Sequence, residues 1–547
     1  MSSLVAIVLA AAALRFVDLP ARGGWDSDQA TSMFDLARAV STGRLPELGP
    51  LSSLMTFHHG ALYYDLLLPA AWLGNGDPTW LVAEIALLSL LVVPIAWWIA
   101  RSIGGPVAGL TAALLAATSA SLISYATFIW NPTLVEPGAA VAFLGAWQAL
   151  RTERARWWIV AAAGAAVAAQ SHVAGGFIIL PLGVAFLFDL WRGPSSRRPR
   201  IATWGLAGVA LFAATFVPLI VYELGHNFSE TRGIVAYFTN PSSATSTAPP
   251  LRVLFAGIRI FAWPLTRWPI ADFKPAFPLA FIAASAMFMG LIWRLGATAR
   301  HRESALSGFG ASEARAERSA AGPMAETEAR SNSPAAPRTV PSADDEHFGV
   351  RVIAGWLLLL IVVLGIGLHS VSEVQELPTE QYHVIADPLV IVAAALIAGG
   401  LWQAGRVPWL TVARRLTAVV ALGAVLAWNV GHWPPLVSPD GGWPAAQAAA
   451  ARLERDAGGS SLALVPLFEP KGIDAYYYPL SRDGFTLSAP ETATTVALLC
   501  DTFWLQDCEG AAETGWLATS QAGRGLTLID RYAAAPDRIL SVYRREP

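Results

Sequence analysis

Long apolar stretches that carry almost no charge are the feature that most constrains this chain. A helix that crosses a bilayer needs about 20 mainly apolar residues, and about eleven windows meet or nearly meet that length. The windows are 3–19, 80–100, 106–126, 133–150, 157–172, 175–191, 201–221, 276–295, 350–370, 384–404 and 416–433. Only 14% of the residues are charged, whereas soluble domains carry about 25%. The sequence therefore predicts an all-α polytopic membrane protein.

The basic residues predict how the chain is oriented in the membrane. Arginines such as Arg101, Arg151, Arg192 and Arg294 fall in alternate loops, and loops rich in Lys and Arg stay in the cytoplasm. The remaining loops, at 20–79, 127–132, 222–275 and 371–383, are then on the outer face of the cytoplasmic membrane, together with the C-terminal tail. The first apolar stretch lacks a preceding basic region, so we expect an anchor that is retained.

Three segments do not read as spans. Tyr63–Leu73 is too short to cross the bilayer and would break the alternation, so it predicts an interfacial helix. Residues 303–347 are rich in Ala, Ser, Arg, Glu and Pro without an apolar period, which predicts a disordered cytoplasmic linker. Residues 434–547 predict a small extracytoplasmic α/β domain beside a transmembrane domain over 1–433. Its expected strands are Ser461–Leu467, Thr495–Cys500 and Ile539–Arg544.

Both cysteines of the chain, Cys500 and Cys508, lie in this last segment. A location outside the cytoplasm permits a disulfide between them. Two reduced, unrelated thiols are the alternative.

The sequence also contains no basic stretch interleaved with aromatic residues, so nothing in it indicates a nucleic-acid partner.

An acidic turn, Gly23-Gly24-Trp25-Asp26-Ser27-Asp28, follows the first apolar window. A carboxylate buried there against tryptophan and lipid is well placed to act as a general base. Two carboxylates at positions i and i+2 also suit a hard divalent cation such as Mg²⁺ or Mn²⁺. The alternative is that they only solvate the loop or cap a helix beginning near Gln29, with Asp28 as the cap.

Other polar residues of the outer loops have two readings each. His58 and His59 suit a metal or a phosphate, although adjacent side chains point different ways, or they are simply interface residues. Glu136 lies just inside a window, where an ionisable group is either functional or neutral near the surface. His172 is either part of a site or a hydrogen-bonded helix end. Outer basic residues suggest a lipid phosphate or anionic headgroups: Arg232, Arg252, Arg259, Arg267 and Lys274.

Taken together, these segments resemble the C-type (GT-C) membrane glycosyltransferases, in particular the protein O-mannosyltransferases and the lipid A aminoarabinose transferases of bacteria. Trp25-Asp26-Ser27-Asp28-Gln29-Ala30 stands where that family has an aromatic residue and Asp-Glu. His58-His59-Gly60-Ala61-Leu62-Tyr63-Tyr64 stands in place of His-Pro-Pro-Leu-Tyr-Tyr. Glu136, behind Asn131-Pro132, occupies the place of a second acid. Gln381-Tyr382-His383-Val384 resembles the family's entry to a late helix.

The resemblance covers the first 220 residues well and the rest only by hydropathy. If Asp28 corresponds to the family aspartate, Gln29 stands in place of the family glutamate. If Asp26 corresponds to it instead, the two acidic residues of the motif are no longer adjacent. We favour Asp28, because Gln29-Ala30 then continues into a helix as the family pattern does.

The resemblance implies an inverting transfer of a sugar from a polyprenyl-phosphate donor to an acceptor hydroxyl of an envelope lipid, polysaccharide or protein. Asp28 would be the base, and Asp26 and Glu136 would orient the acceptor, the base or a divalent metal ion. The expected donor contacts are His58, His59, Tyr63, Tyr64, Arg259, Arg267, Lys274, Tyr382 and His383. A transporter or flippase and a non-catalytic scaffold are the alternatives, but transporters place polar residues near the mid-membrane.

Overall fold

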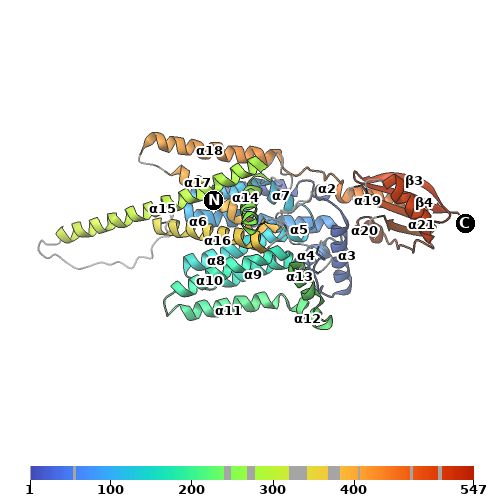
Figure 1. Cartoon of the computed structure of the whole chain (residues 1–547), viewed down its shortest axis with the longest axis horizontal. Helices are drawn as coiled ribbons and strands as arrows, with labels where there is room; N and C mark the ends of the chain where they lie inside the picture. Colours follow the sequence, from blue (N-terminus) through green and yellow to red (C-terminus); the bar gives the residue numbers. More distant parts are fainter. Residues whose placement is uncertain are drawn as a thin grey trace.

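The computed structural model describes residues 2–52, 57–239, 248–267, 277–319, 342–367, 382–403, 407–467, 472–502, 505 and 508–546. It shows a bundle of long helices with a small sheet at one end (Figure 1). The chain begins at the opposite end of this bundle from its C-terminus. Side chains between 303 and 319 are outside the description.

The helices of the first half are α1 (Ser2–Phe16), α2 (Leu19–Arg22), α3 (Ser27–Thr42), α4 (Leu62–Leu73), α5 (Pro78–Leu90), α6 (Val92–Thr118), α7 (Ala120–Tyr125), η1 (Asn131–Leu134), α8 (Val135–Thr152), α9 (Trp157–Ser171), η2 (Val173–Ile178), α10 (Ile179–Arg192), α11 (Arg198–Ala214), α12 (Val217–Gly225), α13 (Ser229–Thr239) and α14 (Pro249–Thr266). The second half contains α15 (Phe277–Ser319), α16 (Ala343–Gly367), η6 (Val384–Ala386), α17 (Asp387–Trp402), α18 (Pro408–Gly431), α19 (Gly442–Ala457), β1 (Leu462–Pro466), α20 (Asp474–Arg482), β2 (Thr495–Asp501), η7 (Cys508–Ala512), α21 (Glu513–Thr519), η8 (Gln521–Gly523), β3 (Leu526–Ala535) and β4 (Arg538–Arg545).

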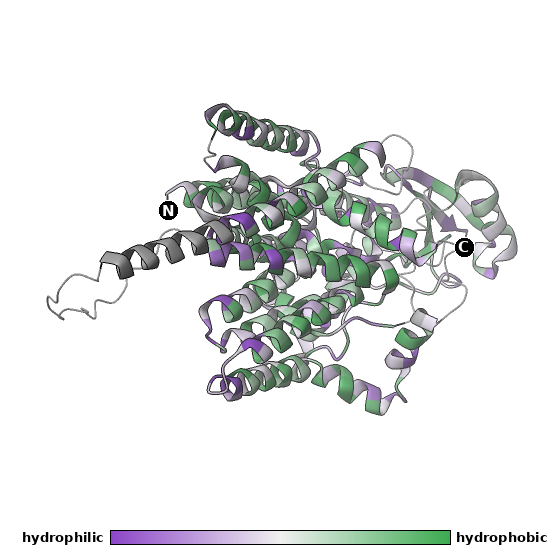
Figure 2. Ribbon diagram, turned by 60° about the vertical axis from the view of Figure 1, so that its left-hand side comes forward, coloured by the Kyte–Doolittle hydropathy of each residue, from purple (hydrophilic) through white to green (hydrophobic). Residues whose placement is uncertain are grey.

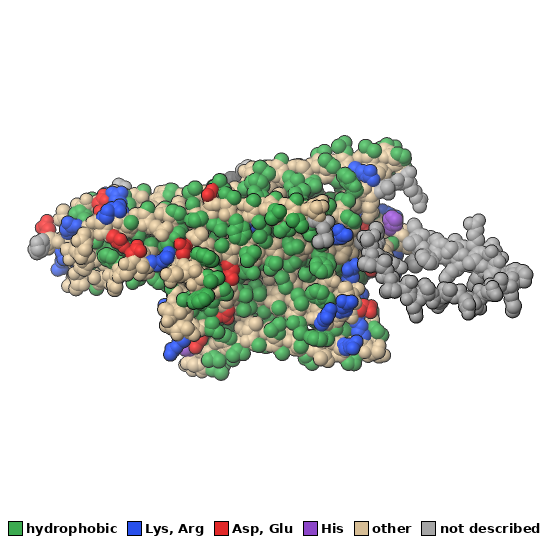
Figure 3. All heavy atoms as spheres, turned by 180° about the vertical axis from the view of Figure 1, so that it is seen from behind, with side chains coloured by type: hydrophobic (Ala, Val, Ile, Leu, Met, Phe, Trp, Pro, Cys, Tyr) green, Lys and Arg blue, Asp and Glu red, His purple; other side chains and the backbone are tan. Residues whose placement is uncertain are grey.

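The bundle has the surface of a multi-pass membrane protein. Within the described residues, 6 helices are long and apolar enough to cross a membrane, or 7 if the bent pair α11–α12 is one span. One of them, Pro78–Thr118, is interrupted at Gly105 and covers two of the predicted windows. Hydrophobic side chains cover the middle of the bundle, and charged ones gather mainly toward its ends (Figures 2 and 3). The full count of about eleven spans stays a prediction.

Two predicted loops contain helices instead. The outer loop expected at 222–275 includes α14, which packs against α15, α16 and α17. The arginines of α14 lower the mean hydropathy of this stretch, so a hydropathy window did not identify its apolar face. Within 303–347, where a disordered linker is expected, α15 continues to Ser319 and α16 begins at Ala343, and the linker itself stays a prediction. Alanine, glutamate and arginine are strong helix formers, so the segment needs no apolar core to be helical.

The C-terminal residues form a mixed sheet with strand order β1-β2-β4-β3. β1 and β2 are parallel, and β4 runs antiparallel to both of its neighbours. β1, β2 and β4 lie where strands are predicted, and β2 is buried along its whole length. The pattern analysis missed β3, a largely exposed edge strand that carries Thr, Asp and Arg. A separate domain over 434–547 stays a prediction.

The hydrophobic core at this end belongs to both parts of the chain. One buried cluster contains Trp25, Tyr63 and Leu81 from the first loop and its neighbours, together with Trp443 and Tyr476 from the C-terminal region. Removing either part would expose the apolar surface of the other. The sheet is therefore packed on the first loop.

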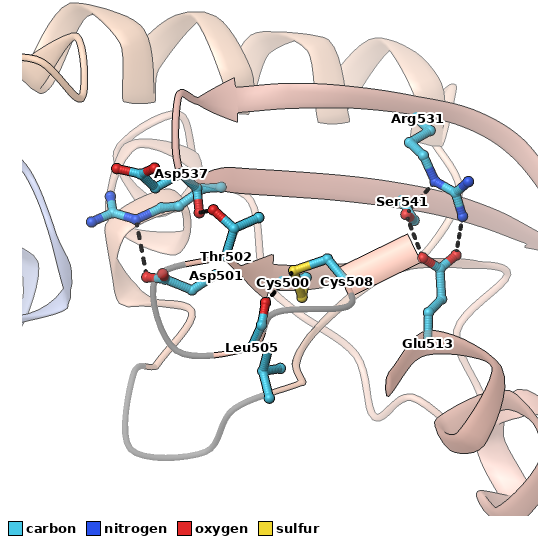
Figure 4. The surroundings of a disulfide bond; sticks show 10 residues. Cys500, Asp501, Thr502, Leu505, Cys508, Glu513, Arg531, Asp537 and Ser541 are labelled. Atoms are coloured by element: carbon cyan, nitrogen blue, oxygen red, sulfur yellow. Dashed lines mark hydrogen bonds and ion pairs between the residues drawn. A yellow bond between two sulfur atoms is a disulfide. The ribbon is translucent and has the colours of Figure 1, made fainter. Parts of the chain in front are cut away.

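Cys500 and Cys508 form a disulfide bond in the structure (Figure 4). The alternative of two reduced, unrelated thiols is therefore not the one seen. The bond closes a loop with a sequence separation of 8 at the end of β2. We expect the double variant Cys500→Ala/Cys508→Ala to lower the free energy of unfolding by about 2–3 kcal/mol, because the unfolded chain regains loop freedom. Pulse proteolysis of the purified protein, with peptides from 472–546 followed by mass spectrometry, measures this change. Equal cleavage of the variant and the wild type would contradict it.

Candidate functional site

The acidic turn forms the N-terminus of α3. Asp26 is its N-cap and accepts a hydrogen bond from the Ser27 backbone N–H at 2.7 Å. The Asp26 backbone N–H donates to Gln29 Oε1 at 2.9 Å, which completes a capping box. The capping role expected of Asp28 thus belongs to Asp26, because the helix begins two residues earlier. Gln29, which departs from the family pattern, is the residue that a capping box requires at this position.

Asp28 lies in the first turn of α3 with an exposed side chain. A carboxylate there is favoured by the helix dipole. Ser32 and Asp35 follow at i+4 and i+7, so all three share one face of the helix. The Tyr64 hydroxyl donates to Asp35 Oδ2 at 3.3 Å, which joins this face to α4.

Asp35 is a functional candidate that the sequence reasoning missed. Burial raises the pKa of its carboxyl above the ordinary value, although Arg38 opposes that shift, and His58 lies close enough to affect it. A carboxyl seven residues after Asp28 on a predicted helix was the signal that could have identified it. The structure therefore brings together the acidic turn and the His-Tyr motif.

The two adjacent histidines face different neighbours. A short antiparallel pairing between Gly49–Leu51 and His58–His59 turns the side chains apart. His58 Nδ1 lies 3.2 Å from Glu230 Oε2 of α13, and its backbone N–H donates to the same oxygen at 2.5 Å. His59 is buried and stacks on His172, with ring centroids 5.2 Å apart.

His59 belongs to an aromatic row that joins three distant segments. Phe57 lies on one side of His59 at 5.8 Å, and His172 on the other side is 5.3 Å from Tyr382. Burial and the neighbouring His58 lower the pKa of His59 to about 4. The His59 imidazole is therefore neutral at pH 7, so it would contact a phosphate without adding a positive charge. His383, next to Tyr382, is fully buried.

Close packing of Gly60 on Gln170 fixes the start of α4. The Gly60 N–H donates to the Gln170 carbonyl at 3.0 Å, and an added Cβ would lie 2.3 Å from Gln170 Oε1. Only glycine fits this approach. Tyr63 and Tyr64 are both buried in α4, and the Tyr63 hydroxyl has no hydrogen-bond partner among the described residues.

Glu136 lies inside the bundle, not at its outer surface. It is 1% exposed, and its carboxyl interacts with that of Asp387 at the start of α17. Arg15 supplies a nearby positive charge and donates to the carbonyls of Ala116 and Ala117. The sequence reasoning missed Asp387. Like Glu136, it begins a helix and precedes a proline, a repeated pattern that could have paired the two.

The outer basic residues do not form one surface. Arg252 and Arg259 are buried on α14, seven residues apart and therefore on one face. Arg267 Nη1 donates to the His432 carbonyl at 3.1 Å. Arg232 is exposed on α13, and Lys274 lies outside the described residues.

One of the two predicted metal ligands of the acidic turn, Asp26, is already engaged by protein groups. Asp26 Oδ1, besides capping α3, lies 3.2 Å from Arg538 Nη2. In the described part of the chain, no group of three or more His, Cys, Asp or Glu side chains is placed to hold a metal ion. The expected metal role of Asp26 and Asp28 stays a prediction.

Arg538, on β4, holds the acidic turn from the C-terminal sheet. Its Nη1 donates to the Trp25 carbonyl at 2.8 Å, and its Nε lies 3.6 Å from Asp501 Oδ2. Although burial disfavours the charge, Asp26 and then Tyr476 raise the pKa of Arg538 above its ordinary value. Figure 4 shows Asp501 beside the disulfide that fixes the end of β2.

Three further contacts hold the turn in the same way. Trp25 Nε1 donates to the Ala475 carbonyl at 2.7 Å, and the Trp25 N–H to Asp440 Oδ2 at 2.8 Å. Ser27 Oγ donates to the Gly472 carbonyl at 2.7 Å. The orientation of the first turn of α3, and with it Asp28, is therefore set by the C-terminal region.

Comparisons with known proteins identify the class of this fold. The chain is similar to ArnT from Cupriavidus metallidurans in the apo state, at a TM-score of 0.55 and 12% identity, over 98% of this chain and 97% of that one. ArnT from Cupriavidus metallidurans bound to undecaprenyl phosphate matches at 0.54 and 13%, over the same shares. An oligosaccharyltransferase from Archaeoglobus fulgidus matches at only 0.47 and 10%, over 97% of this chain and 72% of that one. The two ArnT matches show that the fold is that of the C-type membrane glycosyltransferases.

Within that class, a family model described as "Dolichyl-phosphate-mannose-protein mannosyltransferase" matches residues 60–226. The matched range begins in the His-Tyr motif and includes Glu136 and His172. A search of curated proteins by sequence finds no match. The resemblance to C-type glycosyltransferases that the motifs indicate is confirmed.

The lowered pKa of His59 predicts a pH-dependent stability. Its folded-state value of about 4 lies below the ordinary 6.5, so between these values the unfolded chain binds more protons and the fold loses stability as the pH falls. The variant His59→Phe keeps an aromatic ring in the aromatic row but has no group that binds a proton in this pH range. We expect the fall in unfolding free energy between pH 6.5 and 4 to become shallower by up to about 1.4 kcal/mol per pH unit. Denaturant unfolding at several pH values measures it, and parallel curves for variant and wild type would contradict it.

The Arg538 contacts predict a local effect at the acidic turn. We expect Arg538→Gln to speed backbone hydrogen exchange at residues 25–30 by about tenfold, because the turn loses its charged partner. The matched control is Arg452→Gln, which breaks the 2.5 Å ion pair with Asp530 elsewhere in the C-terminal region. Exchange at 25–30 should stay unchanged in that control. Equal exchange in both variants would show that Arg538 does not hold the turn.

Proposed function

We propose that this protein transfers a sugar from a polyprenyl-phosphate donor to an acceptor hydroxyl, with inversion, on the outer face of the cytoplasmic membrane. The observation that carries the proposal is the exposed carboxylate of Asp28 on a capped helix turn, on one face with Asp35 and beside the His-Tyr motif. The fold adds support, because one similar structure, ArnT, is bound to undecaprenyl phosphate.

The proposed reaction is a single displacement. The carboxylate of Asp28 takes the proton of the acceptor hydroxyl, and the acceptor oxygen forms a bond to the anomeric carbon. The bond between that carbon and the phosphate oxygen breaks on the opposite face, and polyprenyl phosphate leaves with the bonding electrons. The proton on Asp28 then passes to water. A base held at a fixed position is effective because the encounter with the hydroxyl is already arranged.

The residues around Asp28 divide the remaining tasks in this proposal. Asp26 holds the turn through its cap and Arg538, so it positions the base and is not itself a second base. His58, half-exposed and held by Glu230, is the histidine best placed to donate a hydrogen bond to the leaving phosphate. Tyr382, at the end of the aromatic row, lies next to the late segment that the family resemblance associates with the donor.

Other residues have proposed roles of their own. Arg259, Arg267 and Lys274 would neutralise the phosphate as it leaves. Glu136, buried beside Asp387, would act on the site through the packing of α8 and not by touching the acceptor. A divalent ion would need ligands beyond Asp26, whose oxygen is already engaged.

The base assignment has a direct test. We expect Asp28→Asn to reduce sugar transfer from a synthetic polyprenyl-phosphate donor by more than about tenfold, which corresponds to about 1.4 kcal/mol of barrier, because the amide cannot accept the proton. The matched control Asp483→Asn changes an exposed aspartate at the end of α20 and should transfer normally. Transfer rates in purified membranes and melting temperatures are measured together.

The outcomes separate the candidate carboxylates. Transfer by Asp28→Asn within tenfold of the wild type removes the base role of that residue. If Asp35→Asn then abolishes transfer while the fold remains stable, the base is on the same face of α3 but two turns further along. Loss of transfer only with loss of folding in every variant would leave the acidic turn with a structural role and contradict the proposal.

A further inference from the structure

A groove lies at the end of the bundle opposite to α3, between α16 on one side and α8 and α10 on the other. It encloses about 640 Å³. Along α16 it extends from Asp344 to Leu359, which corresponds to about 22 Å of helix. The proposed reaction at the acidic turn does not involve this groove.

One end of the groove is apolar and open to the membrane. Val184 of α10 lines it and is 45% exposed, and Phe188, one turn further along α10, stacks on Phe348 at the boundary with the other end, with ring centroids 6.2 Å apart. Gly355 of α16 lies in its wall, and a Cβ added there would meet no atom within 4 Å. The groove therefore has open space beside Gly355 that an apolar chain can occupy.

The other end carries guanidinium groups. Arg192 lies over the Phe348 ring at 4.8 Å, and Arg151 and Arg351 line the same end with exposed side chains. Within the described residues, neither Arg151 nor Arg351 forms an ion pair. Three acidic residues, Glu153, Asp344 and Asp345, also line the groove, against four arginines, Arg151, Arg192, Arg302 and Arg351. Asp344 pairs with Arg302 at 2.7 Å, and Asp345 accepts from the Ser342 N–H.

The change from apolar to cationic along one groove selects the ligand. A free phosphate would use only the arginine end, and a neutral lipid only the apolar end. A molecule with acyl chains and an anionic phosphate uses both, and arginine is the side chain that best binds phosphate oxygens. We propose that this groove binds an anionic phospholipid of the surrounding bilayer, with its phosphate at Arg151 and Arg351 and one chain along Gly355.

Binding to the purified full-length protein in mild detergent tests the site. The probes are phosphatidylglycerol, phosphatidylcholine and inorganic phosphate, and the readouts are native mass spectrometry and the melting temperature. We expect phosphatidylglycerol to bind at a concentration at least tenfold lower than phosphatidylcholine. Equal binding of the two lipids would overturn the proposal.

Variants separate the two ends of the groove. Arg151→Gln/Arg351→Gln removes the phosphate contacts, and Gly355→Leu fills the apolar end. We expect each to weaken phosphatidylglycerol binding by about tenfold. The matched control Arg200→Gln changes an exposed arginine on α11 at the same end of the bundle and should bind normally. An unchanged affinity in both groove variants, or inorganic phosphate that competes fully while Gly355→Leu has no effect, would overturn the proposal.

A labelling experiment on the wild-type protein does not depend on the folding of any variant. A photoreactive phosphatidylglycerol with its reactive group on the acyl chain should label peptides from α10 and from residues 344–359. Labels confined to other helices would contradict the proposed position. Because the groove is remote from Asp28, loss of lipid binding with normal sugar transfer would leave the proposed function intact.

Discussion

Arg538 contacts the backbone oxygen of Trp25 and the carboxylate of Asp26, and through them it determines how α3 begins. The charge is half-buried between a strand and a helix terminus, where a paired guanidinium gains more than it would in water. The shared hydrophobic core around Trp25, Trp443 and Tyr476 excludes solvent from the same contact. The acidic turn is therefore a product of two distant parts of the chain, and its geometry depends on both.

The bundle beneath this turn contains ionisable groups that a lipid-facing helix would not tolerate. Arg15, Glu136 and Asp387 are each at most 1% exposed, and Arg15 supplies the positive charge beside the two interacting carboxyl groups, one on α8 and one on α17. Breaking such a group by removing one member leaves a buried charge without compensation, which costs more than the group contributes. Their burial favours one arrangement of α1, α8 and α17. That arrangement positions the loops connected to these helices.

Hydropathy was sufficient to predict the long helices, and turn chemistry was sufficient to place a helix behind Trp25. The strands β1, β2 and β4 were predictable because buried strands read as continuous apolar runs. By contrast, α14 was missed because Arg252 and Arg259 interrupt its apolar face, and Asp35 because its only signal is its spacing of seven residues from Asp28 on the same helix face. Above all, the sequence contains no local signal that joins Arg538 to Asp26. That contact comes from tertiary packing, which residue patterns do not encode locally.

The contact between Trp25 and Arg538 also bears on how the protein is made. The two residues are 513 positions apart, so at a synthesis rate of roughly 5–20 residues per second the acidic turn waits about half a minute or longer for its partner. During that interval the first loop can form its capping box but lacks its contacts with Arg538. A nascent chain therefore presents the turn in an unfinished form, and truncated products that end before β4 never complete it. Assembly of the sheet is thus the step that completes the acidic turn.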